Sequence, residues 1–481
     1  MSAQASPAEL RRRIGHPIVD ADGHVLEMLP AVFPFLRESL GSRLFEDYLK
    51  QGPPVRRRVG ARSEAELRAD RSPQAAWWAA VTDHPVDRAT VMFPALLRER
   101  MGELGIDYSV LYTTHGLSTC AIEHEELRRG VARGFNDYYA EVYGPHRKQL
   151  AVAGIIPMHT PREAIEELEH CKRIGLKVVG FPEGVRRPIE AGPSSHPSLW
   201  PGQAHWFDTF GLDSAHDYDP VWAKAQELGF AVTFHGSLGL RPGAVSSPTS
   251  YGYNHVWRFA GVSAPVCKSL FLGGVTRRFP GLAFAFLECG VSWATQMLGD
   301  LIEHWERRNL DALRANLDPE RLRPAEVETY FERYGGAIRE RLEGDFGQAL
   351  AGMPIDGATP AELDEWKHLG VRSPDEIVER FAPSFYFGCE AGDRGVATAF
   401  PPIPARGARL NAIFSSDMGH WDVTRLDDVV PEAFELLDGG LVSPEDFRRF
   451  CFENPVALYR KADPDFFAGT ALETAVAELP A

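Results

Sequence analysis

The sequence has few cysteines and no long apolar run. Only six of the 481 residues are cysteine, and no pair has the two-residue spacing of a typical zinc or redox motif. Scattered cysteines in a chain of this length are typical of buried, reduced thiols and not of a disulfide framework. No apolar run is long enough to cross a bilayer, and the polar start, which ends in Arg11-Arg12-Arg13, does not read as a secretory signal. We therefore expect a cytoplasmic protein with no membrane partner.

Basic residues are in the minority. Lysine and arginine number 51 against 67 acidic residues, and the formal net charge is -16. Nucleic acids and anionic membranes select for basic patches, so we expect neither as a partner. The apolar fraction of 44% and the charged fraction of 25% are ordinary for a soluble globular protein. The length exceeds that of a usual single core, which leaves two domains or one large barrel with insertions.

Short apolar segments alternate with amphipathic segments over most of the length. Such segments, bounded by turn residues, are typical of buried strands. About eight are found, of which the seventh is the weakest. They lie at 17–24, 107–112, 150–156, 176–181, 230–235, 282–288, 384–388 and 411–416.

Helix start signals fall between these strands. Thr160-Pro161 combines an N-cap with proline at the first helical position, and Ser443-Pro444 does the same. Asp219-Pro220 begins another helix, for which Gly229 is a suitable C-terminal cap. Alternating strands and helices predict parallel strands, and eight such units close most economically into a (β/α)₈ TIM barrel. A doubly wound open sheet is the alternative, but no glycine-rich phosphate loop follows the first strand.

Four segments are too long for simple barrel connections. We expect a single domain over 1–481, with the barrel at about 15–460 and long, largely helical insertions. Long structured loops in a compact domain are often lids or binding loops. The last insertion is strongly charged, which instead favours a solvated excursion or an oligomer contact. The insertions are 39–87, 183–218, 236–265 and 307–382.

Metal-type ligands follow four of the predicted strands. Asp22 and His24 end the first strand, His235 ends the fifth and Glu288 the sixth; Asp417 follows the eighth, with His420 three residues later. Taken alone, Asp22-Gly23-His24 reads as a strand-end turn. In a parallel barrel, however, all strands present their carboxyl ends to one face, where active sites are built. Several carboxylates buried in one pocket need a balancing cation, so the pattern predicts a divalent metal site.

Five blocks of sequence carry a family resemblance, which covers about 15–460. They resemble blocks of the amidohydrolase-related family, also called amidohydrolase 2, which includes aminocarboxymuconate-semialdehyde decarboxylase and related aromatic acid decarboxylases. The blocks are Gly105-Ile106-Asp107, residues 219–236, residues 274–293, residues 416–422 (SDMGHWD) and residues 453–459 (ENPVALY).

The resemblance implies a metal-dependent enzyme with one catalytic ion, zinc or manganese. Carried over by position, the ligands are Asp22, His24, His235 and Asp417, and Asp417 also shares in general-base work. A water on such an ion has its pKa lowered toward neutrality and attacks a carbonyl. The implied activity is hydrolysis or non-oxidative decarboxylation of a small organic acid or cyclic compound. The alternative is that His24 and His235 are ordinary core histidines.

Two departures from the family pattern make the site more acidic. Asp22 stands where the family often has histidine, and Glu288 stands where the decarboxylases present a histidine. We expect Glu288 and His420 to share in catalysis with Asp417. Glu288 is also suited to bind a second metal, which leaves open a dinuclear iron or manganese monooxygenase. As a third alternative, Glu288 anchors a loop through backbone N–H groups.

Substrate and partners are less well defined by the sequence. We expect Trp293, His255 and Arg88 to contact a small-molecule substrate, because an arginine can pair with a carboxylate and aromatic rings form apolar pocket walls. Aromatic core residues and surface arginines are the ordinary alternatives. We expect a homo-oligomer, most simply a dimer. A catalytically silent subunit that supports a partner remains a non-enzymatic alternative, although the ligand set is complete.

Overall fold

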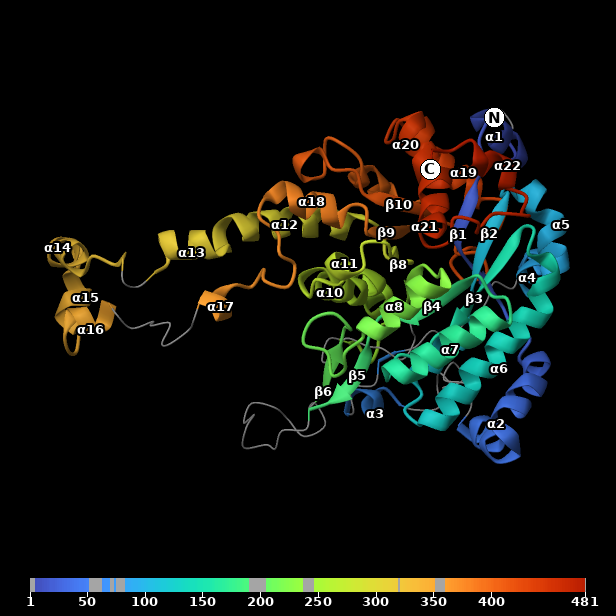
Figure 1. Ribbon diagram of the computed structural model, residues 1–481, viewed down its shortest axis with the longest axis horizontal. Helices are drawn as coiled ribbons and strands as arrows, with labels where there is room; N and C mark the ends of the chain where they lie inside the picture. The colour runs from blue at the N-terminus through green and yellow to red at the C-terminus, as the bar shows by residue number, and fades with distance from the viewer. Residues whose placement is uncertain are drawn as a thin grey trace.

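Eight parallel strands form the centre of the molecule (Figure 1). The computed structural model describes residues 5–51, 63–69, 73–74, 83–189, 205–236, 246–318, 321–350 and 360–480. All eight predicted strands are confirmed, and neighbours in the sheet follow their order in the chain. They are β1 (Val19–Val25), β2 (Tyr108–Thr113), β3 (Leu150–Ile155), β4 (Val178–Pro182), β7 (Val232–His235), β8 (Phe284–Phe286), β9 (Phe385–Glu390) and β10 (Asn411–Ser415).

The first and last strands meet and bring the sheet round into a barrel. The backbone N–H of Asp417 donates to the Asp22 carbonyl at 2.9 Å, and the N–H of His24 donates to the Met418 carbonyl at 2.8 Å. These bonds join the carboxyl ends of β1 and β10, which lie at opposite ends of the strand order. The predicted (β/α)₈ barrel is confirmed, and the open doubly wound sheet is not formed.

Helices cover the outside of the barrel (Figure 1). The predicted starts are confirmed: the hydroxyls of Thr160 and Ser443 cap α7 and α20, and Gly229 ends α8 with a φ of 73°. The principal helices between and after the strands are α6 (Glu125–Tyr143), α7 (Pro161–Arg173), α8 (Asp219–Leu228), α10 (Arg258–Leu272), α11 (Val275–Arg278), α12 (Ser292–Arg308), α18 (Pro374–Phe381), α19 (Val429–Asp438), α20 (Pro444–Arg448) and α21 (Asn454–Ala462).

Alternate strand residues divide the core in two. One set, which includes Phe284 and Phe286, packs outward against the helices. The other set, which includes Ala283, Ala285 and Tyr108, belongs to a second cluster that also contains side chains of α21 and the C-terminal segment. Successive strand residues point to opposite faces, so this division is the one expected for a filled barrel and not for a pore.

Additional elements surround these units. Helices α13–α16 extend away from the strands in Figure 1. The predicted insertions contain most of the additional elements, and parts of all four lie outside the described residues. The elements are α1 (Pro7–Ile14), α2 (Leu29–Gln51, interrupted at Gly41), α3 (Glu64–Ala69), α4 (Pro85–Met92), α5 (Pro94–Leu104), the antiparallel pair β5 (Val185–Pro188) and β6 (His205–Asp208), α9 (Tyr251–His255), α13 (Leu310–Asn316), α14 (Pro324–Tyr334), α15 (Gly336–Arg341), α16 (Phe346–Leu350), α17 (Pro360–Leu363) and α22 (Glu473–Ala477).

A search of the described helices for a membrane span is negative. None of them combines the length and the apolar character that crossing a bilayer requires.

Candidate metal centre

The first strand delivers two candidate ligands through an irregularity in its pairing. The register of β1 against β2 shifts between Asp20 and Gly23, so the strand carries a bulge just before His24. Bulges re-aim side chains and are frequent beside active sites. A Cβ on Gly23 would lie 2.7 Å from Asp20 Oδ2 and 3.2 Å from a Leu111 methyl group, so only glycine fits. Asp22 and His24 are both fully buried here.

Asp20 stabilises this bulge through hydrogen bonds to neighbouring strands. Its carboxylate accepts hydrogen bonds from the Ser109 hydroxyl at 2.6 Å and from both the backbone N–H and the hydroxyl of Ser416 at 2.9 Å. The side chain thereby ties β1 to β2 and to the end of β10. Burial raises the pKa of Asp20 to about 6. Asp20 positions the ligand strand and is one residue whose role sequence reasoning missed.

His235 is the last residue of β7 and points into the same space. Its ring stacks on Tyr112, with centroids 5.3 Å apart, and the Tyr112 hydroxyl donates to Thr233 Oγ1 at 2.9 Å. The ring is therefore held from one side by a residue that is itself fixed. Burial lowers the pKa of His235, but the Asp22 and Glu288 carboxylates outweigh burial and raise it to about 9.

Glu288 and Asp417 follow β8 and β10 in an unusual backbone conformation. Their φ angles are 52° and 49°, in the left-handed region that side-chain-bearing residues rarely adopt. Such strain costs of order 1–3 kcal/mol per residue and clusters at functional sites. Glu288 and Asp417 thus share a left-handed backbone conformation, each beyond the carboxyl end of a different strand.

The donor atoms around His24 lie at the separations expected for ligands of one ion. His24 Nε2 lies 3.1 Å from His235 Nε2, 3.4 Å from Asp417 Oδ1 and 3.7 Å from Asp22 Oδ1. The distance from His235 Nε2 to Asp22 Oδ1 is 3.5 Å. Atoms placed about 2.0–2.2 Å from a divalent ion are separated by roughly 3–3.8 Å in four- or five-coordinate geometry. Nitrogen and carboxylate oxygen donors in this arrangement fit a divalent metal.

Unpartnered anionic oxygens support the same fit. Both carboxylate oxygens of Asp22 are buried without a hydrogen-bond partner among the described residues. Burial raises the pKa of Asp22, and it raises the pKa of Asp417 well above the usual range. Desolvated carboxylates are costly unless a positive charge compensates them. A divalent cation supplies that charge.

His420 adds a titratable group beside the four ligands. Its Nδ1 lies 2.9 Å from Glu288 Oε1 and 2.7 Å from Asp417 Oδ1, and its ring stacks on His24 with centroids 3.7 Å apart. Burial lowers the pKa of His420, but Asp417 and Glu288 outweigh it and raise the pKa well above the ordinary value. Burial lowers the pKa of His24 well below its ordinary value, which keeps that imidazole neutral, as metal binding requires.

His420, His24, Glu288 and Asp417 form one group of potential metal ligands, and Asp22, His24 and His235 form another. Within each group the ligand atoms lie within 4.8 Å of one another. Because His24 belongs to both groups, the described ligands form one continuous centre.

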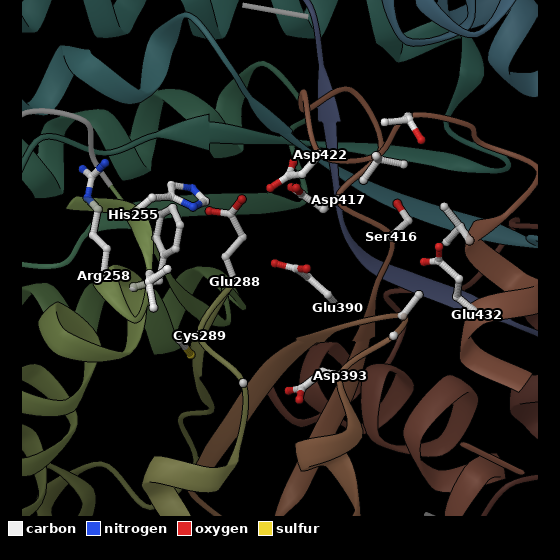
Figure 2. A pocket seen from close by; sticks show the side chains of 18 of the residues that line it. His255, Arg258, Glu288, Cys289, Glu390, Asp393, Ser416, Asp417, Asp422 and Glu432 are labelled. Carbon is white, nitrogen blue, oxygen red and sulfur yellow. The ribbon is translucent and has the colours of Figure 1, made fainter. Parts of the chain in front are cut away.

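A cavity of about 590 Å³ opens from this centre, and its lining includes Glu288, Asp417 and His255 (Figure 2). Of the three predicted substrate contacts, the structure therefore brings only His255 to the cavity. Trp293, on α12, packs edge-on against Phe286 and Phe387 and is not part of the lining. Arg88, on α4, is exposed and borders a separate hollow of about 20 Å³ beside His420.

Two further acidic residues at strand ends were not assigned to the site from the sequence, although Glu183 was noted as a polar group after the fourth strand. Glu183 directly follows β4, is 1% exposed, and accepts a hydrogen bond from the Ser263 hydroxyl at 2.8 Å. Burial raises the pKa of Glu183 to about 7. Glu390 is the last residue of β9 and lines the cavity. The sequence contained a signal for both residues, because Glu183 and Glu390 follow predicted strands, as the assigned ligands do.

A family model confirms what the geometry indicates. The model described as amidohydrolase matches residues 19–335, which include β1, β7 and β8 with their ligands. The chain belongs to the amidohydrolase family. The family and fold predicted from the sequence are thus confirmed, and the chain is a member of an enzyme family.

Several solved structures are similar to this chain. An amidohydrolase from Mycobacterium avium subsp. paratuberculosis is 16% identical, with a TM-score of 0.52 and coverage of 92% of this chain and 99% of that chain. A dihydroxybenzoic acid decarboxylase from Polaromonas, with bound manganese and 2-nitroresorcinol, is 16% identical with a TM-score of 0.49, covering 85% and 96%. A 2,6-dihydroxybenzoate decarboxylase from Rhizobium is 15% identical with a TM-score of 0.46, covering 92% and 99%. At 16% identity, the likeness to the first of these structures shows the fold alone.

Proposed function

We propose that this amidohydrolase-family protein hydrolyses a small molecule at a carbonyl group, with one divalent ion held by Asp22, His24, His235 and Asp417. The observation that carries the proposal is a set of four donor-atom separations of 3.1–3.7 Å at the carboxyl ends of the barrel strands, three from His24 to the other ligands and one between His235 and Asp22. The cavity of about 590 Å³ that opens there has the size of a small-molecule site. When bound, the ion lowers the pKa of a water molecule and polarises the carbonyl.

Side chains of the protein transfer the protons of this reaction. As the water oxygen bonds to the carbonyl carbon, Asp417 accepts the proton that the water loses. His420, whose Nδ1 lies 2.7 Å from Asp417 Oδ1, passes a proton to the amine or alcohol that leaves when its bond to carbon breaks. Glu288 orients the imidazole through the 2.9 Å contact to the same nitrogen. Atoms and charge balance, because one water is consumed and its two hydrogens end on the two products.

Non-oxidative decarboxylation is the second candidate, and His420 favours it. The Nδ1 atom of His420 lies 2.7 Å from Asp417 Oδ1 and 2.9 Å from Glu288 Oε1, and these carboxylates raise the pKa of His420 and favour its protonated form. A protonated imidazole can donate its proton to the carbon atom that loses carbon dioxide. Water labelled with ¹⁸O distinguishes the two reactions, because only hydrolysis incorporates the label into the acid product.

Metal identity is part of the proposal. The set combines two imidazoles with carboxylates, a mixture that suits zinc or manganese, and iron if the enzyme is an oxygenase. The family match gives no support to the dinuclear monooxygenase. Two iron or manganese equivalents with oxygen consumption would establish that alternative in place of the hydrolase. The complete ligand set also argues against a silent subunit.

Elemental analysis of the purified protein tests the proposal. We expect about one equivalent of zinc or manganese in the wild type, and loss of most of it in His235→Ala. His304→Ala is the matched control, because His304 lies on α12 with a side chain that is 54% exposed. Failure of the wild type to bind metal after reconstitution, or equal metal content in His235→Ala, would contradict the assignment.

A further inference from the structure

The wall of the cavity is acidic beyond the metal centre. In addition to Glu288 and Asp417, five carboxylate side chains line it within the described part of the chain, against two guanidinium groups. The guanidiniums belong to Arg258 and Arg425. The five carboxylates are those of Glu390, Asp393, Asp422, Asp428 and Glu432.

Existing contacts leave this excess of negative charge in place. Arg425 makes a bidentate ion pair with Asp427, with Nε–Oδ1 and Nη2–Oδ2 distances of 3.0 and 2.6 Å. Its Nε also lies 3.6 Å from Asp428 Oδ2. Arg258 lies over the ring of Phe259, 5.5 Å from its centroid. A divalent ion does not neutralise the wall either, because the carboxylates of two of its ligands, Asp22 and Asp417, already balance its charge.

Glu390 shows the effect of this crowding most directly. Figure 2 shows its carboxylate in the middle of the cavity, between those of Glu288, Asp417 and Asp393. Burial, followed by the negative charges of Glu288 and Asp422, raises the pKa of Glu390 to about 7. A positively charged group in the cavity would relieve this repulsion.

Unpartnered buried polarity inside the cavity points to a ligand independently of the acidic wall. Glu288 belongs to the lining, its side chain is 4% exposed, and its Oε2 has no hydrogen-bond partner among the described residues. The deep side of the cavity therefore contains a buried anionic oxygen that is available to a positively charged group of a ligand.

Aromatic rings border the same space. His255, Trp257 and Phe259 belong to the lining. The ring of Trp421 lies 5.6 Å from that of His255 and 5.9 Å from that of Tyr251. Aromatic faces attract organic cations, because the face of the ring carries partial negative charge. Carboxylates and rings together are a recognition surface for an organic ammonium or guanidinium group.

We propose that the substrate of this centre is a small organic cation, an ester, amide or lactone that carries an ammonium or guanidinium group, and not an aromatic carboxylate. The inference rests on the proposed function, because it assumes that the reacting carbonyl reaches the metal centre. The positive group then lies among Glu390, Asp422 and the aromatic rings. An anionic acid would have to enter against the field of the same carboxylates.

Binding of three matched probes to the manganese-loaded protein tests this charge preference. The probes are benzylammonium, benzyl alcohol and benzoate, which share one ring and differ in charge. We expect benzylammonium to bind at least about tenfold more tightly than benzoate by calorimetry at low salt, with the preference falling as salt rises. Equal or tighter binding of benzoate would overturn the proposal.

Charge-neutral variants connect the preference to the wall. Glu390→Gln and Asp422→Asn should each reduce the ratio of benzylammonium to benzoate affinity several-fold. Glu303→Gln is the control, because Glu303 lies on α12 with a side chain that is 58% exposed. A ratio unchanged in both wall variants would overturn the proposal.

The same titrations in metal-free protein separate this inference from the proposed function. The five wall carboxylates are present with or without an ion, so we expect benzylammonium to be preferred in both forms. A protein that binds no metal but prefers benzylammonium would contradict the proposed function alone. A metal-loaded, active protein that prefers benzoate would contradict the substrate class alone.

Discussion

Asp417 combines three properties that separate it from an ordinary buried carboxylate. Its φ is 49°, its Oδ1 lies 3.4 Å from His24 Nε2, and the same oxygen lies 2.7 Å from His420 Nδ1. The residue thus touches both a metal ligand and the group that carries protons. At the scale of single residues, the chemistry of this centre depends most on Asp417.

Replacing Asp417 with asparagine should abolish turnover and leave the barrel folded. The amide keeps the shape of the side chain but neither accepts a proton as readily nor supplies an anionic ligand. We expect a loss of at least about 100-fold in kcat, the lower end of general-base contributions. Circular dichroism should stay unchanged. Asp438→Asn, at a surface ion pair with Arg13, is the control; retained turnover in Asp417→Asn would remove this residue from the mechanism.

His159 lies away from the metal ligands and links stability to pH. Its Nδ1 is buried without a partner among the described residues, and burial, followed by Arg128 and Arg187, lowers its pKa to about 3. In the unfolded chain the pKa is near 6.5, so between about pH 3 and 6.5 the unfolded state binds the extra proton. Stability is therefore complete above pH 6.5 and is lost as the pH falls toward 3.

We expect acidification from pH 7 to pH 5 to cost about 1–2 kcal/mol of unfolding free energy through this one histidine. Urea unfolding at both pH values measures the loss. His159→Gln should show a smaller loss than the wild type, and His304→Gln, at an exposed position on α12, should show the same loss as the wild type. Identical pH dependence in wild type and His159→Gln would contradict the prediction.

At the scale of elements, the carboxyl ends of the strands decide what the site can do. The bulge in β1 aims Asp22 and His24, and the left-handed residues after β8 and β10 aim Glu288 and Asp417. Helices enclose the site. The Ser263 hydroxyl of α10 donates a hydrogen bond to Glu183, which follows β4. The ligands are thus held by rigid strands, and the cavity around them is completed by loops and helix ends.

Gly23 tests the role of the β1 bulge. Alanine here would place its Cβ 2.7 Å from Asp20 Oδ2, so Gly23→Ala should cost about 1–3 kcal/mol of stability and weaken metal binding. Urea unfolding and a metal titration measure the two effects. In the control Gly102→Ala, on α5, the added Cβ meets no atom within 4 Å, and we expect a gain of roughly 0.5–1 kcal/mol. Unchanged metal affinity in Gly23→Ala would show that the bulge does not position the ligands.

At the scale of the whole molecule, the metal centre joins the first and last strands of the barrel. Its ligands come from β1, β7 and the segments after β8 and β10, and β1 and β10 meet directly beneath it. An ion held there cross-links strands far apart in the sequence. Helices α13–α16 extend away from the strands that carry these ligands (Figure 1), and the predicted dimer remains a prediction.

Removal of the metal should therefore destabilise the whole barrel. A ligand present at 100 times its Kd stabilises the folded state by about 2.7 kcal/mol. We expect a chelator to lower Tm by several degrees and added manganese or zinc to restore it. His235→Ala should have a low Tm that neither treatment changes, while His304→Ala should respond as the wild type does. A Tm independent of the metal in the wild type would contradict the prediction.

Much of the fold and the ligand set followed from the sequence alone. Apolar segments marked all eight strands, and parallel strands in a barrel bring their carboxyl ends to one face, so Asp22, His24, His235, Glu288 and Asp417 could be grouped without coordinates. Their roles as ligands and catalysts remain predictions. Local patterns suffice at this level, because strand ends and helix caps are determined by neighbouring residues.

Only the tertiary structure decided how these side chains are aimed and what surrounds them. The register shift before Gly23 and the positive φ angles of Glu288 and Asp417 depend on contacts with distant strands. Trp293 and Arg88 were predicted to contact substrate, but the paths of α12 and α4 place them outside the main cavity. Its acidic wall comes from five carboxylates between residues 390 and 432, and only the paths of the segments after β9 and β10 bring them around one cavity.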